Sequence, residues 1–329
     1  MYHRDYCETR WRRIGLARHG GLIVKLSRTI HVPGAGYSLF ESARYSAETS
    51  SFSWVDIEQA VLFGMSPNGD VTVNEMDQDF LPLALPLASS EFLLASGSAL
   101  HIFDLKVRTS SVWLEMDNFD NGTRFNDGAF DLFGILWIGT MRLSEESECG
   151  VLYRIQPDKS ASIEYRGVGI SNGIHWVDQK NGYYVDSASK KLMRIVQNSS
   201  GFLQSVQQIA EWEEGEPDGI AVTSTGEVWV AVWDGKRIDR FSSRGEALGC
   251  IPTSGTRPTS ISFGSGRASQ SMIITFAAEP GTKSEAAKVE LFSGPDVPLP
   301  HQSYNLTPTV WPGNLLDQAC QTKGDHERA

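Results

Sequence analysis

The chain has 329 residues, 40% of them hydrophobic, which suffices for a large core and argues against intrinsic disorder. Its formal net charge of −11 argues against nucleic acid or an anionic membrane surface as the main partner. The four cysteines form no CxxC pair, so neither a zinc knot nor a dense disulfide framework is expected. No apolar run reaches the roughly 18 residues that span a membrane, and we expect a cytoplasmic protein.

Short segments of strand character, separated by turns rich in Gly, Asn, Asp and Ser, follow one another along the chain. No long stretch has helical periodicity, so the sequence predicts an all-β meander. In chain order the expected strands are Phe52–Ile57, Val61–Met65, Phe92–Ala95, Leu100–Leu105, Ser111–Met116, Ile135–Thr140, Val151–Ile155, Tyr183–Asp186, Leu192–Val196, Val228–Val232, Ile238–Phe241, Ile261–Phe263 and Met272–Phe276.

The strongest strands recur at intervals of roughly 40–48 residues, the size of a four-stranded propeller blade. Six such units predict a six-bladed β-propeller of four-stranded antiparallel blades over residues 28–305. Residues 1–27 are expected to form an N-terminal arm and residues 306–329 a polar C-terminal tail. A strand around Ile23–His31 is expected to close the ring by pairing within the last blade.

Three stretches repeat one pattern, in which an Asn or Asp and a Gly are followed by an aromatic-bearing strand. They begin at Asn126, Asn172 and Asp218, about 46 residues apart, a period typical of a propeller blade. Extending this phase back by two blades reaches Glu41. Residues in the same phase of a radial repeat occupy equivalent positions, so these four side chains should meet at one mouth of the central channel.

Two carboxylates and one or two amide oxygens form a set of hard oxygen donors. Such a set suits one divalent cation, Ca²⁺ before Mg²⁺ or Mn²⁺, and Zn²⁺ can also occupy it. Arg124 lies two residues before Asn126, on the same face of an extended segment, and a guanidinium there could orient an oxygen-rich ligand.

Structural interpretations compete with these functional ones. Asn-Gly and Asp-Gly are the commonest hairpin-turn dipeptides, and Arg124 has Asp127 and Asp131 as candidate salt-bridge partners. His175 lies in an apolar strand, as a core histidine would. The recurring tryptophans are expected between blades; they are Trp54, Trp137, Trp176, Trp229 and Trp233.

Taken together, the motifs resemble the SMP-30/gluconolactonase/luciferin-regenerating-enzyme family over about residues 35–300. The segment 124–128 with Trp137–Met141 resembles the family's RxNDG…GTM motif, and Ser171–Gly173 with Tyr183–Ser187 resembles NG…LYxxDS. Pro217–Gly219 with Glu227–Ala231 resembles PDG…GxxWVA. The segment Leu39–Ala43, followed by Trp54–Ile57, stands where the family has LGEGP…WVDI.

The resemblance implies a divalent ion held by Glu41, Asn172 and Asp218, with Arg124 and Asn126 as substrate-binding residues. It implies a metal-dependent lactonase, a carboxylic ester hydrolase that opens a sugar lactone or related cyclic ester. In that mechanism the ion polarises the lactone carbonyl and activates a water, and Asp218 takes the water's proton. We expect a small-molecule lactone or ester as the partner, and a monomer or weak homo-oligomer.

Three departures from the family pattern affect the pocket. The loop Phe40–Ala43 lacks the family's glycines and proline, Ser144 stands where some relatives carry an acidic residue, and Thr223 replaces an Asp. Two alternatives therefore stay open at this point. One is the same site used for isomerisation or dehydration, and the other is a propeller that binds calcium or a protein without turnover.

Overall fold

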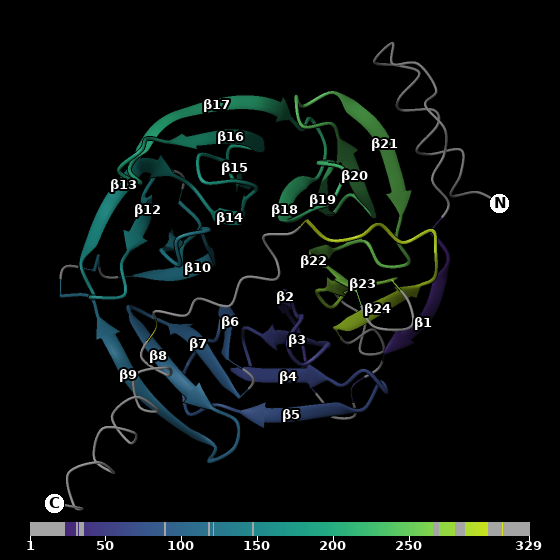
Figure 1. Ribbon diagram of the computed structural model, residues 1–329, viewed down its shortest axis with the longest axis horizontal. Helices are drawn as coiled ribbons and strands as arrows, with labels where there is room; N and C mark the ends of the chain where they lie inside the picture. Colours follow the sequence, from purple (N-terminus) through teal and green to yellow (C-terminus); the bar gives the residue numbers. More distant parts are fainter. Residues whose placement is uncertain are drawn as a thin grey trace, which may run out of the picture.

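Six four-stranded antiparallel sheets surround a central axis like the blades of a propeller (Figure 1). This computed structural model describes residues 24–30, 32, 36–88, 90–117, 119–120, 122–146, 148–265, 270–279, 287–301 and 311. Within these residues every regular element is a strand. The predicted all-β, six-bladed propeller is confirmed. Most of the expected arm and tail lies outside the described residues.

Each blade is a meander that begins at the axis and ends at the rim. The innermost strands are β2 (Phe40–Ser46), β6 (Leu83–Ala88), β10 (Thr123–Phe130), β14 (Ser171–Trp176), β18 (Glu216–Val222) and β22 (Pro258–Ser265). The second strands are β3 (Ser51–Asp56), β7 (Glu91–Ser96), β11 (Leu136–Arg142), β15 (Asn181–Asp186), β19 (Val228–Trp233) and β23 (Gln270–Phe276). The third strands are β4 (Val61–Met65), β8 (Ala99–Asp104), β12 (Gly150–Ile155), β16 (Lys191–Gln197), β20 (Arg237–Phe241) and β24 (Lys288–Ser293). The outer strands are β5 (Val71–Glu75), β9 (Thr109–Glu115), β13 (Ala161–Val168), β17 (Leu203–Glu211), β21 (Ala247–Pro252) and β1 (Leu26–Ile30).

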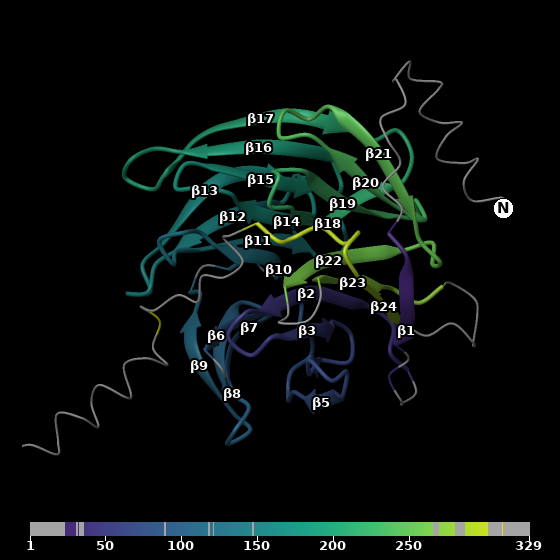
Figure 2. The same cartoon turned by 45° about the vertical axis from the view of Figure 1, so that its right-hand side comes forward.

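The last blade takes its outer strand from the beginning of the chain. Its sheet has the order β1-β24-β23-β22, and Ile30 pairs with Val289 (Figure 2). The expected ring closure by a strand around Ile23–His31 is thereby confirmed. The hydrogen bonds between β1 and β24 complete the last blade, and the chain then continues from β1 into the first blade.

The core fills the spaces between neighbouring blades with aromatic and branched side chains. Trp54, Trp137, Trp176 and Trp229 are at most 1% exposed, as predicted, whereas Trp233 is only partly buried. The Trp137 and Trp176 rings come from adjacent blades and their centroids are 4.8 Å apart. Aromatic pairs of this kind contribute packing beyond the area they bury.

Five of the six innermost strands have a register shift near their beginning, where an extra residue bends the strand. Two of the repeated glycines lie at these bulges and permit close contact with the next blade. A Cβ atom on Gly173 would stand 2.7 Å from the Asp218 carbonyl oxygen, and one on Gly219 would stand 2.7 Å from the Thr259 carbonyl oxygen. The Asn-Gly and Asp-Gly dipeptides therefore lie inside strands, and their interpretation as hairpin turns is wrong.

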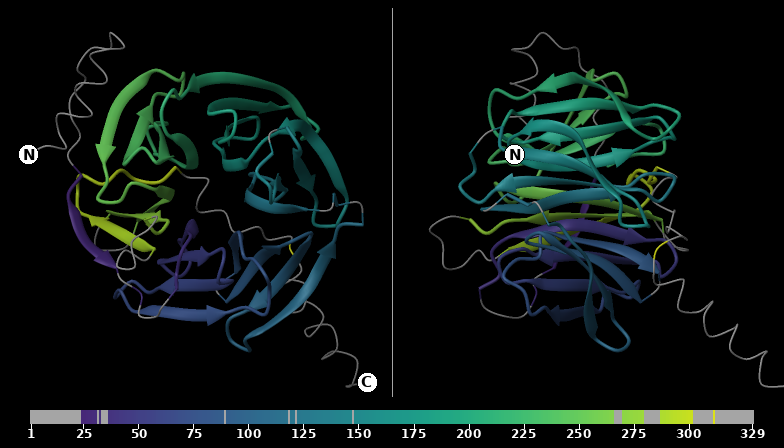
Figure 3. Two further views of the ribbon diagram at one scale, coloured as in Figure 1. Left: turned by 180° about the vertical axis from the view of Figure 1, so that it is seen from behind. Right: turned by 90° about the vertical axis from the view of Figure 1, so that its left-hand side faces the viewer.

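A segment near the end of the chain crosses from the last blade to its neighbour. The Ser224 amide donates to Leu299 O at 2.8 Å, and the His301 amide donates to Val222 O at 3.0 Å. Farther along, Trp311 is 1% exposed and its indole donates to Gly134 O at 2.8 Å. These anchors lie at the turns where β10 and β18 end, the face of the ring opposite to the beginnings of the inner strands (Figure 3). Among the described residues there is no helix with the length and apolarity needed to cross a membrane.

Candidate functional site

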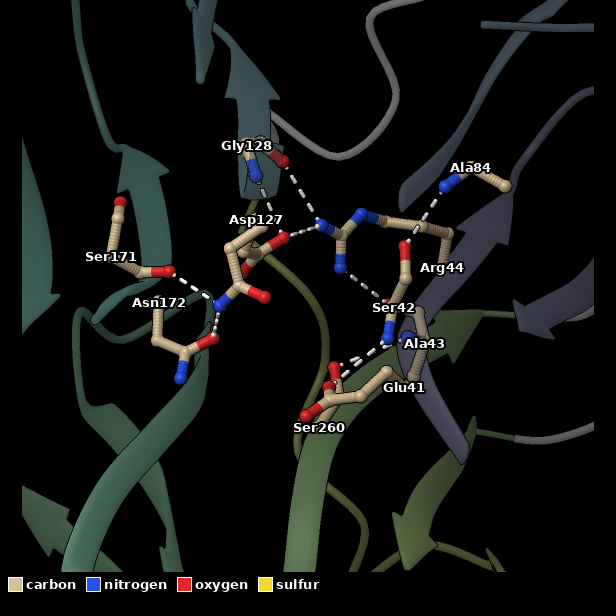
Figure 4. Close-up of polar contacts among 11 residues, drawn as sticks. Glu41, Ser42, Ala43, Arg44, Ala84, Asp127, Gly128, Ser171, Asn172 and Ser260 are labelled. Carbon is tan, nitrogen blue, oxygen red and sulfur yellow. Dashed lines mark hydrogen bonds and ion pairs between the residues drawn. The ribbon is translucent and has the colours of Figure 1, made fainter. Parts of the chain in front are cut away.

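The four residues that the repeat phase selected lie near the beginnings of four innermost strands, at one mouth of the channel. Figure 4 labels two of them, Glu41 and Asn172. Glu41 comes from β2, Asn126 from β10, Asn172 from β14 and Asp218 from β18. Each bulge lies beside one of these residues, so the distorted backbone is where each strand presents its polar side chain. The predicted positions therefore converge from four different blades.

The two carboxylic acids, Glu41 and Asp218, lie close enough for each to influence the other's protonation. Withdrawal from solvent, together with the negative charge of Asp127, raises the pKa of Glu41 to about 8, although the side chain keeps some exposure. Desolvation followed by the negative charge of Glu41 raises the pKa of Asp218 well above its usual range. Two adjacent buried carboxylates resist joint ionisation unless a cation neutralises them.

The Asn172 side chain is held by hydrogen bonds on both of its amide atoms. Asn126 Nδ2 donates to Asn172 Oδ1 at 3.0 Å and to Ser171 O at 2.7 Å. Asn172 Nδ2 donates to Ser187 Oγ at 2.8 Å, and that hydroxyl donates to Pro217 O at 2.6 Å. These partners fix which end of the amide is oxygen, and a carbonyl oxygen keeps a second lone pair for a ligand.

Arg124 begins this hydrogen-bonded chain. Its Nη1 donates to Asn126 Oδ1 at 2.5 Å and to Phe125 O at 3.0 Å. Burial lowers the pKa of Arg124 to about 10, with the Glu41 charge opposing that shift. The alternative interpretation of Arg124 as a salt-bridge partner of Asp127 or Asp131 is wrong, because those carboxylates bond elsewhere. Both hydrogen bonds that Arg124 makes among the described residues use Nη1.

Asp127 bonds to an arginine that the sequence reasoning did not select. Arg44 Nη2 lies 2.7 Å from Asp127 Oδ1 and donates to Gly128 O at 3.0 Å, while Nη1 donates to Ala43 O at 2.9 Å (Figure 4). The interaction joins β2 to β10, which belong to blades separated by the blade of β6. One signal was available: Asp127 directly precedes Gly128, as Asn172 precedes Gly173 and Asp218 precedes Gly219. Arg44 itself has no such signal.

His175 is buried, as the structural interpretation expected. Desolvation lowers its pKa to about 3, and the nearby His301 and the Arg44 cation lower it as well. The two histidine rings meet edge to face, with centroids 5.9 Å apart. The ring is therefore neutral at physiological pH, and it lies three residues farther along β14 than Asn172, toward the opposite face.

The donor set fits a hard divalent cation. Asp218 Oδ1 is buried and accepts no hydrogen bond from the part of the chain described here, although the residue is only 4% exposed. An unsatisfied carboxylate oxygen beside a second carboxylate and an oriented amide oxygen is the donor chemistry that Ca²⁺ and Mg²⁺ prefer. No group of three or more His, Cys, Asp or Glu side chains suited to a metal occurs among the described residues.

Comparisons with known proteins agree with this architecture. The model of the SMP-30/Gluconolactonase/LRE-like region matches residues 39–278. Two relatives are a 6-deoxy-6-sulfogluconolactonase of Pseudomonas putida, 27% identical, and a regucalcin of Danio rerio, 28% identical. The first alignment covers 76% of this chain and 87% of the relative, and the second covers 72% and 82%.

Among solved structures, a regucalcin from Agrobacterium tumefaciens described as a calcium-binding protein superposes with a TM-score of 0.73 at 21% identity. It covers 84% of this chain and 98% of that one, and the likeness establishes the shared fold. The family match spans most of the chain and includes all four converging strands. The protein belongs to the SMP-30/gluconolactonase/LRE-like family.

Proposed function

We propose that this protein is a lactonase that hydrolyses a sugar lactone or related cyclic ester with the help of one divalent cation. The observation that carries the proposal is the convergence of Glu41 and Asp218 at the channel mouth, with Asp218 Oδ1 buried and unsatisfied. A propeller that only scaffolds other proteins has no need for two carboxylates that resist joint ionisation. A propeller that binds calcium without turnover would share this site, and the hydrolysis assay below distinguishes the two. The lactonase among the relatives supports the same reaction type.

In this proposal Glu41, Asn172 and Asp218 hold the cation through three oxygen atoms. When bound, the ion supplies a Lewis acid for the ester carbonyl and lowers the pKa of a water. Asp218 would accept a proton from the attacking water, because its buried Oδ1 makes no hydrogen bond to the described residues and its pKa is raised well above the usual range. The Ser187 and Asn126 contacts hold the Asn172 amide in one orientation.

Arg124 binds the substrate through its remaining N–H groups, and Asn126 holds that guanidinium in place. The Asn126 amide hydrogens already donate to Ser171 and Asn172, so this residue acts on substrate mainly through its neighbours. We propose calcium as the first ion to test, since the oxygen-only donor set suits it and a structural relative is described as calcium-binding. Zinc, manganese and magnesium are the alternatives.

A pH-indicator hydrolysis assay on sugar and alkyl lactones tests the proposal. The protein is first stripped with a chelator, and Ca²⁺, Zn²⁺, Mn²⁺ or Mg²⁺ is then restored separately. We expect turnover to disappear with the chelator and to return with at least one ion. A protein that binds the ion in calorimetry but hydrolyses none of the lactones would contradict the assigned reaction while leaving the cation site intact.

A further inference from the structure

Asp127 is the third carboxylate at the channel mouth, and its hydrogen bonds engage Arg44 and Gly128 rather than the other two carboxylates. It comes from the beginning of β10, next to Asn126, and its negative charge raises the pKa of both Glu41 and Asp218. The carboxylate is therefore within electrostatic reach of the proposed cation site. Its Oδ1 atom nevertheless accepts hydrogen bonds from Arg44 Nη2 at 2.7 Å and from the Gly128 amide at 2.8 Å.

Arg44 is held in this position by more than Asp127. Its two terminal nitrogens also donate to Gly128 O and to Ala43 O, so the guanidinium forms hydrogen bonds to two backbone carbonyls and one carboxylate. Both side chains of the ion pair are largely buried, with 17% and 15% of their surfaces exposed. In such a setting a single charge acts on its neighbours more strongly than at an open surface.

We propose that Arg44 sets the cation affinity of the channel mouth by neutralising Asp127 and holding it out of the ligand set. The inference rests on the proposed function, because it concerns the cation held by Glu41, Asn172 and Asp218. With Arg44 in place, the mouth presents two ligand carboxylates and one paired carboxylate. Without Arg44 it presents three carboxylates and one positive charge fewer, a set that attracts divalent cations more strongly.

Calcium calorimetry on chelator-treated protein tests this assignment. We expect Arg44→Met to bind calcium about five- to tenfold more tightly than wild type, since a unit charge near a divalent ion in a partly solvated site has an effect of this order. Asp127→Asn leaves the Arg44 charge uncompensated and should weaken binding by a similar factor. The double variant Arg44→Met/Asp127→Asn should return close to wild type, because the two charge changes cancel.

Two controls separate this role from a structural one. Arg44→Lys keeps the charge but not the guanidinium geometry, and should keep an affinity near that of wild type. Arg240→Met removes an arginine from an ion pair of similar length, 2.8 Å to Glu227, in the same blade as Asp218 but near the far end of β18. It causes the same change in net charge and should leave calcium affinity unchanged. If the Arg44–Asp127 pair only stabilises the contact between β2 and β10, no variant should bind calcium more tightly than wild type.

The outcomes distinguish this inference from the proposed function. Equal or weaker calcium binding by a folded Arg44→Met protein overturns the inference alone, and wild-type binding then still supports the cation site. Binding by Arg44→Met with none by wild type supports the inference and contradicts the proposed cofactor. No binding by either overturns both. If Arg44→Met does not fold, Asp127→Asn decides, and an affinity equal to wild type overturns the inference.

Discussion

At the scale of single residues, we expect the proposed cation site to depend on side chains that orient its ligands as well as on the ligands themselves. Ser187 makes two hydrogen bonds, one from Asn172 and one to Pro217, and only 4% of its surface is exposed. Such supporting groups typically change metal affinity by about 10- to 100-fold when removed. The amide of Asn172 has a defined orientation because Ser187 and Asn126 hold its two ends.

Ser187→Ala should therefore weaken calcium binding by about tenfold with little change in the melting temperature. The reason is that Asn172 Nδ2 loses its acceptor and the amide can rotate its oxygen away from the carboxylates. Calorimetry of the stripped protein measures the affinity. Ser189→Ala is the matched control, since among the described residues that hydroxyl donates to Asp186 O alone, at 3.3 Å in the same turn. Equal affinities in the two variants would rule out the orienting role.

Asp218→Asn should reduce lactone turnover by about 100-fold or more, because the variant lacks both a ligand charge and the proposed general base. Steady-state hydrolysis with saturating calcium measures the loss. Asp158→Asn changes an exposed turn carboxylate and serves as the control for charge alone. Full activity in the Asp218 variant would exclude Asp218 as the base.

The sequence predicted the positions of Glu41, Asn126, Asn172 and Asp218 because they follow the blade period. It did not predict the Arg44–Asp127 pair, whose members are 83 positions apart and belong to different blades. Periodicity locates the backbone positions that face the channel. It cannot show which carboxylate an arginine will reach, because that depends on side-chain conformations across the channel.

At the scale of the strand, the residue that follows Glu41 at the beginning of β2, Ser42, has a strained backbone conformation. Ser42 has a φ of +53°, a left-handed conformation that costs a non-glycine residue roughly 1–2 kcal/mol. Its Oγ atom accepts a hydrogen bond from the Ala84 amide of the next blade at 3.2 Å. The contact between β2 and β6 thus offsets a conformation that the absence of glycine at this loop makes unfavourable.

Two substitutions at Ser42 should differ in the free energy of unfolding of the metal-free protein. Both lose the hydrogen bond to Ala84, but Ser42→Gly also relieves the left-handed strain. We expect the free energy of unfolding to decrease from wild type to Ser42→Gly to Ser42→Ala, with the two variants separated by about 1 kcal/mol. Chemical denaturation measures the difference. Equal stability of the glycine and alanine variants would mean that the backbone strain is negligible.

The strand scale also shows why the dipeptide statistics failed. Asn-Gly commonly marks a hairpin turn in an isolated sequence. In this ring the glycine at the start of an innermost strand lies against the backbone of the next blade, where the Gly173 position has no room for a Cβ atom. The requirement comes from the packing of blades, which local sequence does not encode.

At the scale of the whole molecule, cation binding and folding stability are linked through the raised pKa values. In the metal-free protein Glu41 has a pKa of about 8, above its value in an unfolded chain. A folded-state pKa above the unfolded value gives stability that is present at low pH and is lost as the pH rises through the folded pKa. The pKa of Asp218 is shifted in the same direction.

Stabilisation by calcium should therefore increase from pH 5 to pH 8, as the ion displaces protons from the two carboxyl groups. Paired melting curves with chelator and with calcium measure it at each pH. Buried histidines such as His175, with a lowered pKa, titrate with the opposite sign. These histidines titrate in the same way with chelator and with calcium, so their contribution cancels when the two melting temperatures are subtracted. A difference in melting temperature that is the same at pH 5 and pH 8 would contradict the linkage.

The blade count, the four-stranded repeat and the closing strand were predictable because each blade repeats the same succession of hydrophobic strands and polar turns. The segment that ends at His301 and the buried Trp311 were not, because they follow no repeat. Their contacts depend on turns from several blades that are close only after the ring has formed.

The pairing of β1 with β24 has a consequence for biosynthesis. The first described strand leaves the ribosome before any other part of the ring, but its partner is made almost last. Until then β1 presents an unpaired edge, and the last blade lacks its outer strand. Domains normally begin to fold while their chain is being made. The ring, by contrast, can be sealed only after β24 has been made, so that a polypeptide truncated before β24 carries two open edges able to recruit other strands.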